Sequence, residues 1–227
     1  MALRRHIALD PLDYFLSWST IIATMFVGNA PYTAEELHVL QGASDWERWR
    51  KAIQEDRLGY PEAFNEYASG NLIHQAYHLL QWERVTKLKV NDLETIVEIG
   101  AGYGALAKVI RRLGFEGRYV IFDLPEFEYL QQWYLGRLGI KAEWGPIAPG
   151  HFRCDLLIAL WSLSEMKETT QDEYLSGLLP RHYMIAALDA PWEGEDNARY
   201  LRALNSRRRQ ATDHPAFARE LLFVRIK

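Results

Sequence analysis

The feature that most constrains this chain of 227 residues is an apolar stretch that runs into a glycine-rich turn and then into a helical pattern. The short apolar run over 95–99 predicts a strand, and the spacing of apolar residues over 105–113 predicts a helix. Glycines between a strand and a helix let the backbone approach a ligand with no Cβ in the way. The helix that begins there offers unpaired N–H groups to the same ligand. Residues 100–104 are therefore predicted to bind a cofactor.

An acidic residue lies where such a site needs one. Asp123 follows the second predicted strand, 119–122, and an acid at that position can accept hydrogen bonds from two ribose hydroxyls. The glycines alone also satisfy the looser dinucleotide pattern Gly100-x-Gly102-x-x-Ala105. A nicotinamide-dependent oxidoreductase therefore stays open at this point.

Glu98 favours a different cofactor, because dinucleotide enzymes usually carry an apolar residue two positions before the first glycine. In class I methyltransferases an acid there commonly organises the turn and the amino end of S-adenosylmethionine (SAM). A simple cap on local N–H groups is the alternative interpretation of Glu98. The residues predicted to bind SAM are Asn71, Glu98, Gly100, Ala101, Gly102, Tyr103, Gly104, Asp123 and Leu124.

The order of patterns along the chain predicts an α/β fold of the Rossmann-like kind. Residues 1–93 have helical periodicity, including an apolar helix over 14–27, and are expected to form an N-terminal helical lid region. Residues 94–227 are expected to form the SAM-binding domain, with a helix over 127–138 and further strands at 140–144, 155–160, 183–188 and 220–226. Strands that alternate with helices in this way predict a parallel sheet with helices on both faces. The stretch 190–219 shows no clear pattern.

Composition and net charge limit the kinds of partner that this chain is expected to bind. Cys154 is the one cysteine, so no internal disulfide can form and a reducing cytoplasm is expected. The formal net charge of -4 gives no basic excess for nucleic acid. Residues 14–27 are too short and too polar for a membrane span, and charged residues with a proline at 10–13 interrupt a signal peptide. We therefore predict neither a nucleic-acid nor a membrane partner.

Polar residues recur on one face of the helix predicted over 71–90. Asn71, His74 and His78 are three and four residues apart, and this spacing places them together. Such a stripe either faces solvent or lines a pocket, and we favour the pocket. His74 is the first candidate for a general base and His78 the second, while Tyr77 is a candidate substrate contact.

The loop after the fourth strand is also expected near the reacting groups, since ligands of open parallel sheets bind beyond the carboxyl ends of the strands. Glu165 could act as a base, orient a histidine or be a first-turn acid of the next helix. Trp161 and Ser162 are candidate substrate contacts, although core packing suits Trp161 equally. Asp189 and Asp196 have the wrong spacing for a catechol-type metal site, and no metal is predicted.

Four segments, in order, are similar to those of the bacterial sugar O-methyltransferase family of class I methyltransferases. They are Ser69-Gly70-Asn71-Leu72-Ile73-His74-Gln75-Ala76-Tyr77-His78, Val97-Glu98-Ile99-Gly100-Ala101-Gly102-Tyr103-Gly104, Ile121-Phe122-Asp123-Leu124-Pro125-Glu126 and Ser162-Leu163-Ser164-Glu165-Met166. The resemblance runs from about Thr24 to the C-terminus and departs from the family pattern at Leu160-Trp161. It implies SAM as cofactor and a hydroxyl of a sugar or glycosylated small metabolite as acceptor.

The sequence thus predicts a SAM-dependent sugar O-methyltransferase. A nicotinamide oxidoreductase and a non-catalytic SAM-binding protein are the alternatives. The Asn-Pro-Pro-Tyr motif of base N-methylation is missing from the sequence, which argues against a nucleic-acid N-methyltransferase. The oligomeric state stays open, and a homo-oligomer is compatible with the sequence.

Overall fold

The computed structural model describes residues 2–25, 28–145, 152–188, 211–213 and 220–225, with the backbone only for 188 and the last two ranges. The chain divides into two compact units. The helical unit comprises Met1–Leu80, Gly102–Gly114 and Pro125–Lys141, and the sheet unit comprises Gln81–Ala101, Phe115–Leu124 and Ala142–Lys227. Because each unit draws on both sides of residue 93, a separate lid region and SAM-binding domain remain predictions.

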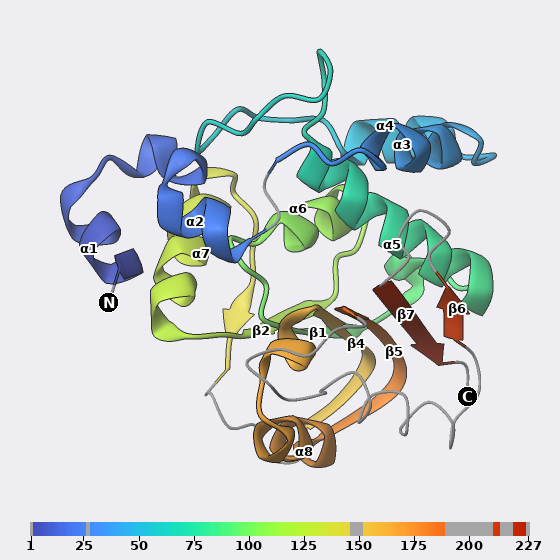
Figure 1. Ribbon diagram of the computed structural model, residues 1–227. Coiled ribbons are helices and arrows are strands. Elements are labelled where there is room, and N and C mark those ends of the chain that lie inside the picture. Colours follow the sequence, from blue (N-terminus) through green and yellow to red (C-terminus); the bar gives the residue numbers. More distant parts are fainter. Residues whose placement is uncertain (1, 26–27, 146–151, 189–210, 214–219, 226–227) are drawn as a thin grey trace. The chain divides into compact units, whose positions relative to one another are not determined.

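A seven-stranded sheet organises the sheet unit (Figure 1). Its strands are β1 (Thr95–Ile99), β2 (Arg118–Phe122), β3 (Glu143–Trp144), β4 (Phe152–Leu160), β5 (Leu178–Leu188), β6 (Ala211–Asp213) and β7 (Glu220–Arg225), in the spatial order β3-β2-β1-β4-β5-β7-β6. Strands β1 to β5 pair in parallel, whereas β7 runs antiparallel to both β5 and β6. This confirms the predicted Rossmann-like α/β fold.

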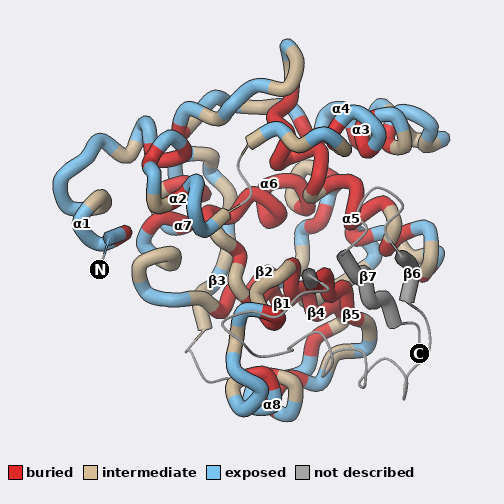
Figure 2. The backbone as a smooth tube through the Cα atoms, viewed as in Figure 1, coloured by how far each residue is buried: buried red, intermediate tan, exposed pale blue. Residues whose placement is uncertain are grey.

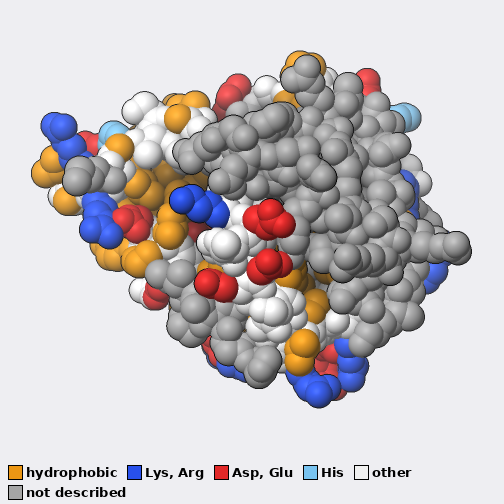
Figure 3. All heavy atoms as spheres, turned by 60° about the horizontal axis from the view of Figure 1, so that its bottom comes forward, with side chains coloured by type: hydrophobic (Ala, Val, Ile, Leu, Met, Phe, Trp, Pro, Cys, Tyr) orange, Lys and Arg blue, Asp and Glu red, His pale blue; other side chains and the backbone are white. Residues whose placement is uncertain are grey.

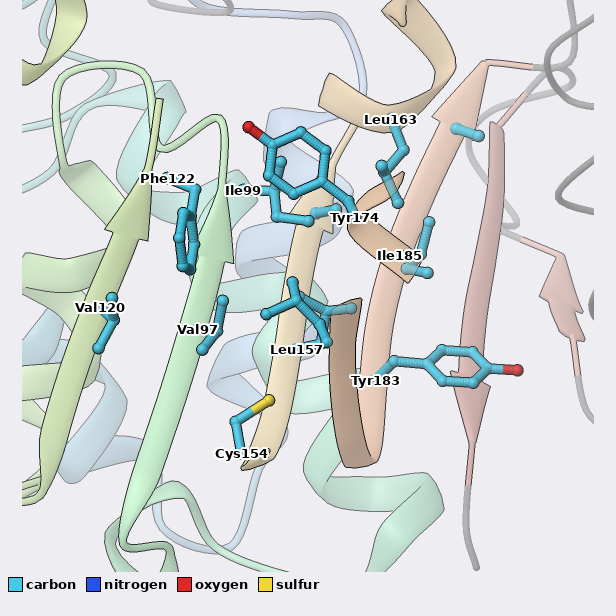
Figure 4. Close-up of a cluster of buried hydrophobic side chains, with 13 residues drawn as sticks. Val97, Ile99, Val120, Phe122, Cys154, Leu157, Leu163, Tyr174, Tyr183 and Ile185 are labelled. Carbon is cyan, nitrogen blue, oxygen red and sulfur yellow. The ribbon is translucent and has the colours of Figure 1, made fainter. Parts of the chain in front are cut away.

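The central strands are apolar because both of their faces are covered, as expected for parallel strands. In β1 every residue after Thr95 is buried, and five successive residues at the end of β4 are buried as well. One core cluster of this unit joins four strands and two helical segments (Figure 4). Its members are Val97, Ile99, Val120, Phe122, Cys154, Leu157, Ala159, Leu163, Tyr174, Leu178, Tyr183, Ile185 and Ala187. Each large aliphatic side chain in it contributes about 1.5–3 kcal/mol by burial.

The helices of the described residues are mostly short. They are α1 (Ala2–Leu9), η1 (Leu12–Ser17), α2 (Ser19–Thr24), α3 (Thr33–Gln41), α4 (Trp46–Ala52), α5 (Gly70–Thr86), η2 (Val90–Asp92), α6 (Ala105–Arg112), α7 (Pro125–Arg137), η3 (Ser162–Glu165) and α8 (Glu168–Gly177). Helix α5 is the longest of these and is buried over most of its length (Figure 2). The helix predicted over 71–90 is therefore confirmed, with its end at Thr86.

The single apolar helix predicted over 14–27 is wrong. The chain forms the 3₁₀ helix η1 and then the short helix α2, because Trp18 adopts an extended backbone with φ −66° and ψ 134°. This break lets the Trp18 ring stack on His6, with the ring centroids 5.2 Å apart. Tyr14 and Ile22 are 53% and 58% exposed, so the apolar spacing did not mark one buried face.

The predicted strands occur, with shifted ends. Strand β3 keeps only two of the five residues predicted at 140–144, while β4 and β5 begin earlier than predicted. Strand β6 falls in the stretch 190–219, where no element was predicted. Asp189 and Asp196 lie outside the described residues. Over the described ranges, no helix has the length and hydropathy needed to cross a membrane.

Candidate cofactor and active site

The glycine turn after β1 has a backbone conformation that residues with a Cβ atom rarely adopt. Gly100, Gly102 and Gly104 have φ values of 69°, 58° and 95°, all in the left-handed region. Gly104 caps the N-terminus of α6, where its carbonyl accepts the Lys108 N–H at 3.1 Å. The predicted strand, glycine turn and helix therefore follow one another as expected.

Within the sheet unit, Gly100 is also required by the loop after β4. A Cβ at Gly100 would lie 2.4 Å from the Cβ of Ser162, which is too close for any side chain. The Ser162 hydroxyl donates to the Ile99 carbonyl at 2.5 Å. Ser162 was predicted to contact substrate, and in the structure its hydroxyl fixes the loop 161–166 against the end of β1.

Trp161 has a strained backbone, with φ 66° and ψ −30°. Its N–H donates to the Ala186 carbonyl at 2.8 Å, and its own carbonyl accepts both the N–H and the hydroxyl of Ser164. Hydrogen bonds at both ends of the residue hold this conformation, which costs on the order of 1–3 kcal/mol in a residue other than glycine. Strain of this kind is often found at ligand sites, and the indole remains a candidate for substrate contact.

Glu98 is buried at the fourth position of β1 and is 5% exposed. Its Oε2 accepts a hydrogen bond of 2.6 Å from the Tyr119 hydroxyl. Burial raises the pKa of Glu98 to about 7, against the effect of the Tyr119 hydrogen bond and with a further contribution from the charge of Asp123. A cation beside Glu98 would lower that pKa and stabilise the carboxylate.

Asp123 follows β2, as predicted for an acid that binds ribose hydroxyls. Its Oδ1 accepts the N–H of Leu124 at 2.8 Å. Leu124 is 56% exposed. These two residues therefore offer a carboxylate and an apolar surface side by side.

The rest of the glycine turn, 102–104, is fixed by groups of the helical unit. The Gly102 carbonyl accepts a hydrogen bond of 2.8 Å from the Gln131 amide. A Cβ at Gly102 would approach the Met25 sulfur at 3.2 Å, and one at Gly104 would approach Leu135 at 3.1 Å. Residues from two distant parts of the chain therefore determine the conformation of the turn.

Asn71 and Tyr103 were both predicted to bind the cofactor, and in the structure their side chains are hydrogen-bonded to each other. The Asn71 amide donates to the Tyr103 hydroxyl at 2.6 Å, and both residues are 3% exposed. The Tyr103 ring also lies edge-on to Phe15 and Tyr134, with centroids 5.3 and 4.9 Å away. In this structure these two side chains hold the turn and the start of α5 together.

The histidine face of α5 is buried rather than exposed to solvent, since His74 is 1% and His78 0% exposed. The Nδ1 atom of His74 lies 2.6 Å from Oε1 of Glu36, and its Nε2 lies 3.4 Å from Nε2 of His78. Glu36 itself is 1% exposed. The sequence had placed the two histidines together but gave no sign of the carboxylate, which is 38 positions away.

Of the other predicted catalytic and substrate residues, Tyr77 lies beside the histidines and Glu165 belongs to the other unit. Tyr77 belongs to the helical unit, is 3% exposed and has its ring centroid 5.9 Å from that of His78. Glu165 ends η3 in the sheet unit and is exposed. In the part of the chain that the structure describes, no group of three or more His, Cys, Asp or Glu side chains could hold a metal ion.

Solved structures share this fold at low sequence identity. A "putative RNA methyltransferase" from Pyrococcus horikoshii has a TM-score of 0.52 and 12% identity, over 87% of this chain and 100% of that one. The Thermoplasma acidophilum protein 1320 has a TM-score of 0.51 and 12% identity, over 87% and 98%. Another Pyrococcus horikoshii protein has a TM-score of 0.51 and 12% identity, over 69% and 89%.

These comparisons define a class of fold, the Rossmann-like fold of class I methyltransferases. The sequence matches no known family model and no curated protein. The resemblance to sugar O-methyltransferases therefore remains a prediction.

Proposed function

We propose that this protein is a SAM-dependent methyltransferase that modifies a hydroxyl of a sugar or of a glycosylated small metabolite. The observation that carries the proposal is the cradle after β1 in a sheet with an antiparallel β7. Three glycines with left-handed backbones precede the N-terminus of α6, the buried Glu98 is the fourth residue of β1, and the acidic Asp123 follows β2. SAM supplies a methyl group on a sulfonium sulfur and carries an ammonium group.

The residues of the cradle suit that cofactor. Glu98 is a buried carboxyl group whose raised pKa a cation would relieve, and the ammonium of SAM is such a cation. Asp123 can accept both ribose hydroxyls, and Leu124 offers an apolar surface to the adenine. The glycines at 100, 102 and 104 hold the left-handed backbone on which Ala101 and Tyr103 are also proposed to contact the cofactor.

A nicotinamide oxidoreductase is the weaker candidate. The dinucleotide-binding sheet has the parallel order 3-2-1-4-5-6, whereas this sheet places an antiparallel β7 between β5 and β6. A buried acid near the pyrophosphate would also add negative charge to negative charge. A non-catalytic SAM-binding protein is the third candidate, and a methyl-transfer assay distinguishes it from an enzyme.

Calorimetry with SAM, with its demethylated product S-adenosylhomocysteine (SAH) and with NAD tests the cofactor. We expect SAM and SAH to bind and NAD not to bind. Asp123→Ala should weaken SAH binding by about 10- to 150-fold, since hydrogen bonds to a charged group contribute about 1.5–3 kcal/mol. Glu116→Ala, which changes an exposed acid just before β2, is the matched control and should leave the affinity unchanged. Tight binding of NAD without a response to SAM would reject the proposal.

The proposed acceptor rests on three observations. The four sequence segments resemble sugar O-methyltransferases, the Asn-Pro-Pro-Tyr motif is missing from the sequence, and the net charge is -4. On the face shown in Figure 3, the Lys and Arg side chains of the described residues lie in small groups beside acidic ones. A net charge of -4 gives little of the phosphate attraction on which nucleic-acid binding depends.

A methyl-transfer assay with radiolabelled SAM tests the acceptor. We expect label in nucleotide-sugars, simple glycosides or glycosylated metabolites, as an ether stable to alkali. RNA transcripts, DNA and protein serve as competing acceptors, and Asp123→Ala is the inactive control. Efficient labelling of RNA would show that the substrate class is wrong, and a wild-type protein that binds SAM and labels none of these acceptors would favour a non-catalytic role.

For the transfer itself, holding the two reactants in line supplies much of the rate. A sugar hydroxyl is a weak nucleophile, and a general base adds about 10²–10⁴-fold. We propose His74 as that base, with His78 beside it, and Glu165 as the candidate to test if neither histidine contributes. Tyr77, Trp161 and Ser162 are proposed to determine which acceptor binds. The single Cys154 suits a reducing cytoplasm, where we propose that the protein acts.

A further inference from the structure

The buried pair Glu36–His74 is more than a packing contact, because its chemistry sets which nitrogen of His74 carries a proton. A carboxylate buried among apolar groups is costly without a donor or a cation. The donor that the structure places at Oε1 of Glu36 is Nδ1 of His74, at 2.6 Å. A histidine that donates through Nδ1 keeps its lone pair on Nε2 while it is neutral.

That lone pair points toward the other histidine of α5. The two Nε2 atoms are 3.4 Å apart, and the rings meet edge-on with centroids 4.6 Å apart. His78 therefore donates to His74, or accepts from it once His74 is protonated. The titratable groups that contact this pair from the elements around it include Glu36 of α3, Tyr32 just before α3 and Tyr77 of α5.

The three groups thus form a line, from Glu36 through His74 to His78, within the helical unit. When His74 is protonated, its ring becomes an imidazolium that has a carboxylate on one side and a second imidazole on the other. Both neighbours favour the charged ring, and neither is exposed to water that would screen the interaction. The same arrangement of base and orienting carboxylate recurs in unrelated enzymes.

We propose that Glu36 is a positioning residue that holds His74 as the Nδ1–H form and stabilises its protonated state during methyl transfer. The inference rests on the proposed function. In the step it serves, the acceptor O–H proton passes to the histidine pair and the acceptor oxygen forms a bond to the methyl carbon. The carbon–sulfur bond breaks with its electron pair left on sulfur, and the proton later leaves to water.

Nitrogen–proton NMR of His74 tests the pairing without any acceptor. We expect the Nδ1–H form in the wild type, and a pKa of His74 that falls by about one unit or more in Glu36→Gln, because a neutral amide no longer stabilises the imidazolium. Glu35→Gln changes the exposed neighbour in the same helix and should leave the His74 signals unchanged. An Nε2–H form in the wild type, or an unchanged pKa in Glu36→Gln, would overturn the inference.

Turnover separates positioning from a purely structural role. Glu36→Gln should reduce kcat by about 10²-fold and move the acidic limb of the pH profile to lower pH, with the SAH dissociation constant within about twofold of the wild type. Glu36→Asp should recover part of the rate, and His74→Ala should lose the acidic limb altogether. A lower Tm with an unaltered pH profile per folded molecule would make Glu36 structural. Failure of the wild type to bind SAM or SAH would instead reject the proposed function.

Discussion

Lys108→Ala is expected to lower the free energy of unfolding by about 3–5 kcal/mol, the usual result of removing one partner from a buried ion pair. Lys108 is fully buried in α6, and its Nζ donates to Glu55, Asp56 and the Tyr134 hydroxyl at 2.8, 2.9 and 2.9 Å. Burial alone would raise the pKa of Asp56, but Lys108 and Arg112 hold that pKa below its usual value. Without the ammonium, two acids would share a poorly solvated site.

Urea unfolding monitored by circular dichroism measures this effect. Arg50→Ala removes an exposed pair with Glu47 and should leave stability nearly unchanged, because solvent screens such pairs. The triple change Lys108→Met, Glu55→Gln and Asp56→Asn removes the buried charges, leaves only the partly exposed Arg112 that pairs with Asp56, and should recover most of the loss. A stability change for Lys108→Ala as small as that of Arg50→Ala would show that the cluster is solvated.

Glu98→Gln is expected to have opposite effects on stability and on cofactor binding. The folded pKa of Glu98 is about 7, above its ordinary value of 4.5, so the protonated form stabilises the fold below about pH 4.5. That stabilisation is lost as the pH rises through 7, by an amount on the order of 3 kcal/mol. Glutamine does not ionise, so the variant should gain stability relative to the wild type between pH 5 and pH 8.

The same variant should bind SAM at least about 10-fold more weakly at pH 8, because the ammonium loses a charged partner. Unfolding curves and calorimetry at the two pH values measure both effects. Tyr119→Phe removes the hydrogen bond that opposes the rise in pKa, and it should make the pH dependence of stability steeper. Equal stability differences at pH 5 and pH 8 would show that Glu98 does not titrate in this range.

Local patterns account for the parts of the fold that the sequence predicted. The strand 95–99 and the helix α6 follow from the spacing of apolar residues, and the turn between them follows from the conformational freedom of glycine. Both are properties of residues that are neighbours in the sequence. The break at Trp18 could not be predicted in this way, because its ring stacks on His6, which lies outside the helix predicted over 14–27. For the same reason the spacing of His74 and His78 was visible, whereas Glu36 was not.

Contacts with residues far away in the sequence also give some residues roles that the sequence patterns did not predict. Tyr103 lies in the glycine turn, and only its hydrogen bond to Asn71 shows that it anchors the turn. Lys108 lies among buried apolar residues of α6, and no sequence pattern signals that its ammonium is buried as well. Both cases depend on segments that fold back from elsewhere in the chain, and a period along one helix does not contain that information.

Selection for stability alone would favour replacement of Trp161 by glycine, because Trp161 has a left-handed backbone. Glycine adopts that backbone without strain, so the position forgoes on the order of 1–3 kcal/mol of stability that a glycine would recover. The proposed contact of the indole with the acceptor would make this position a stability–activity trade-off, in which a less stable fold keeps a large aromatic surface at the carboxyl edge of the sheet. A laboratory evolution experiment that rewards thermal tolerance without assaying turnover should therefore replace Trp161 early.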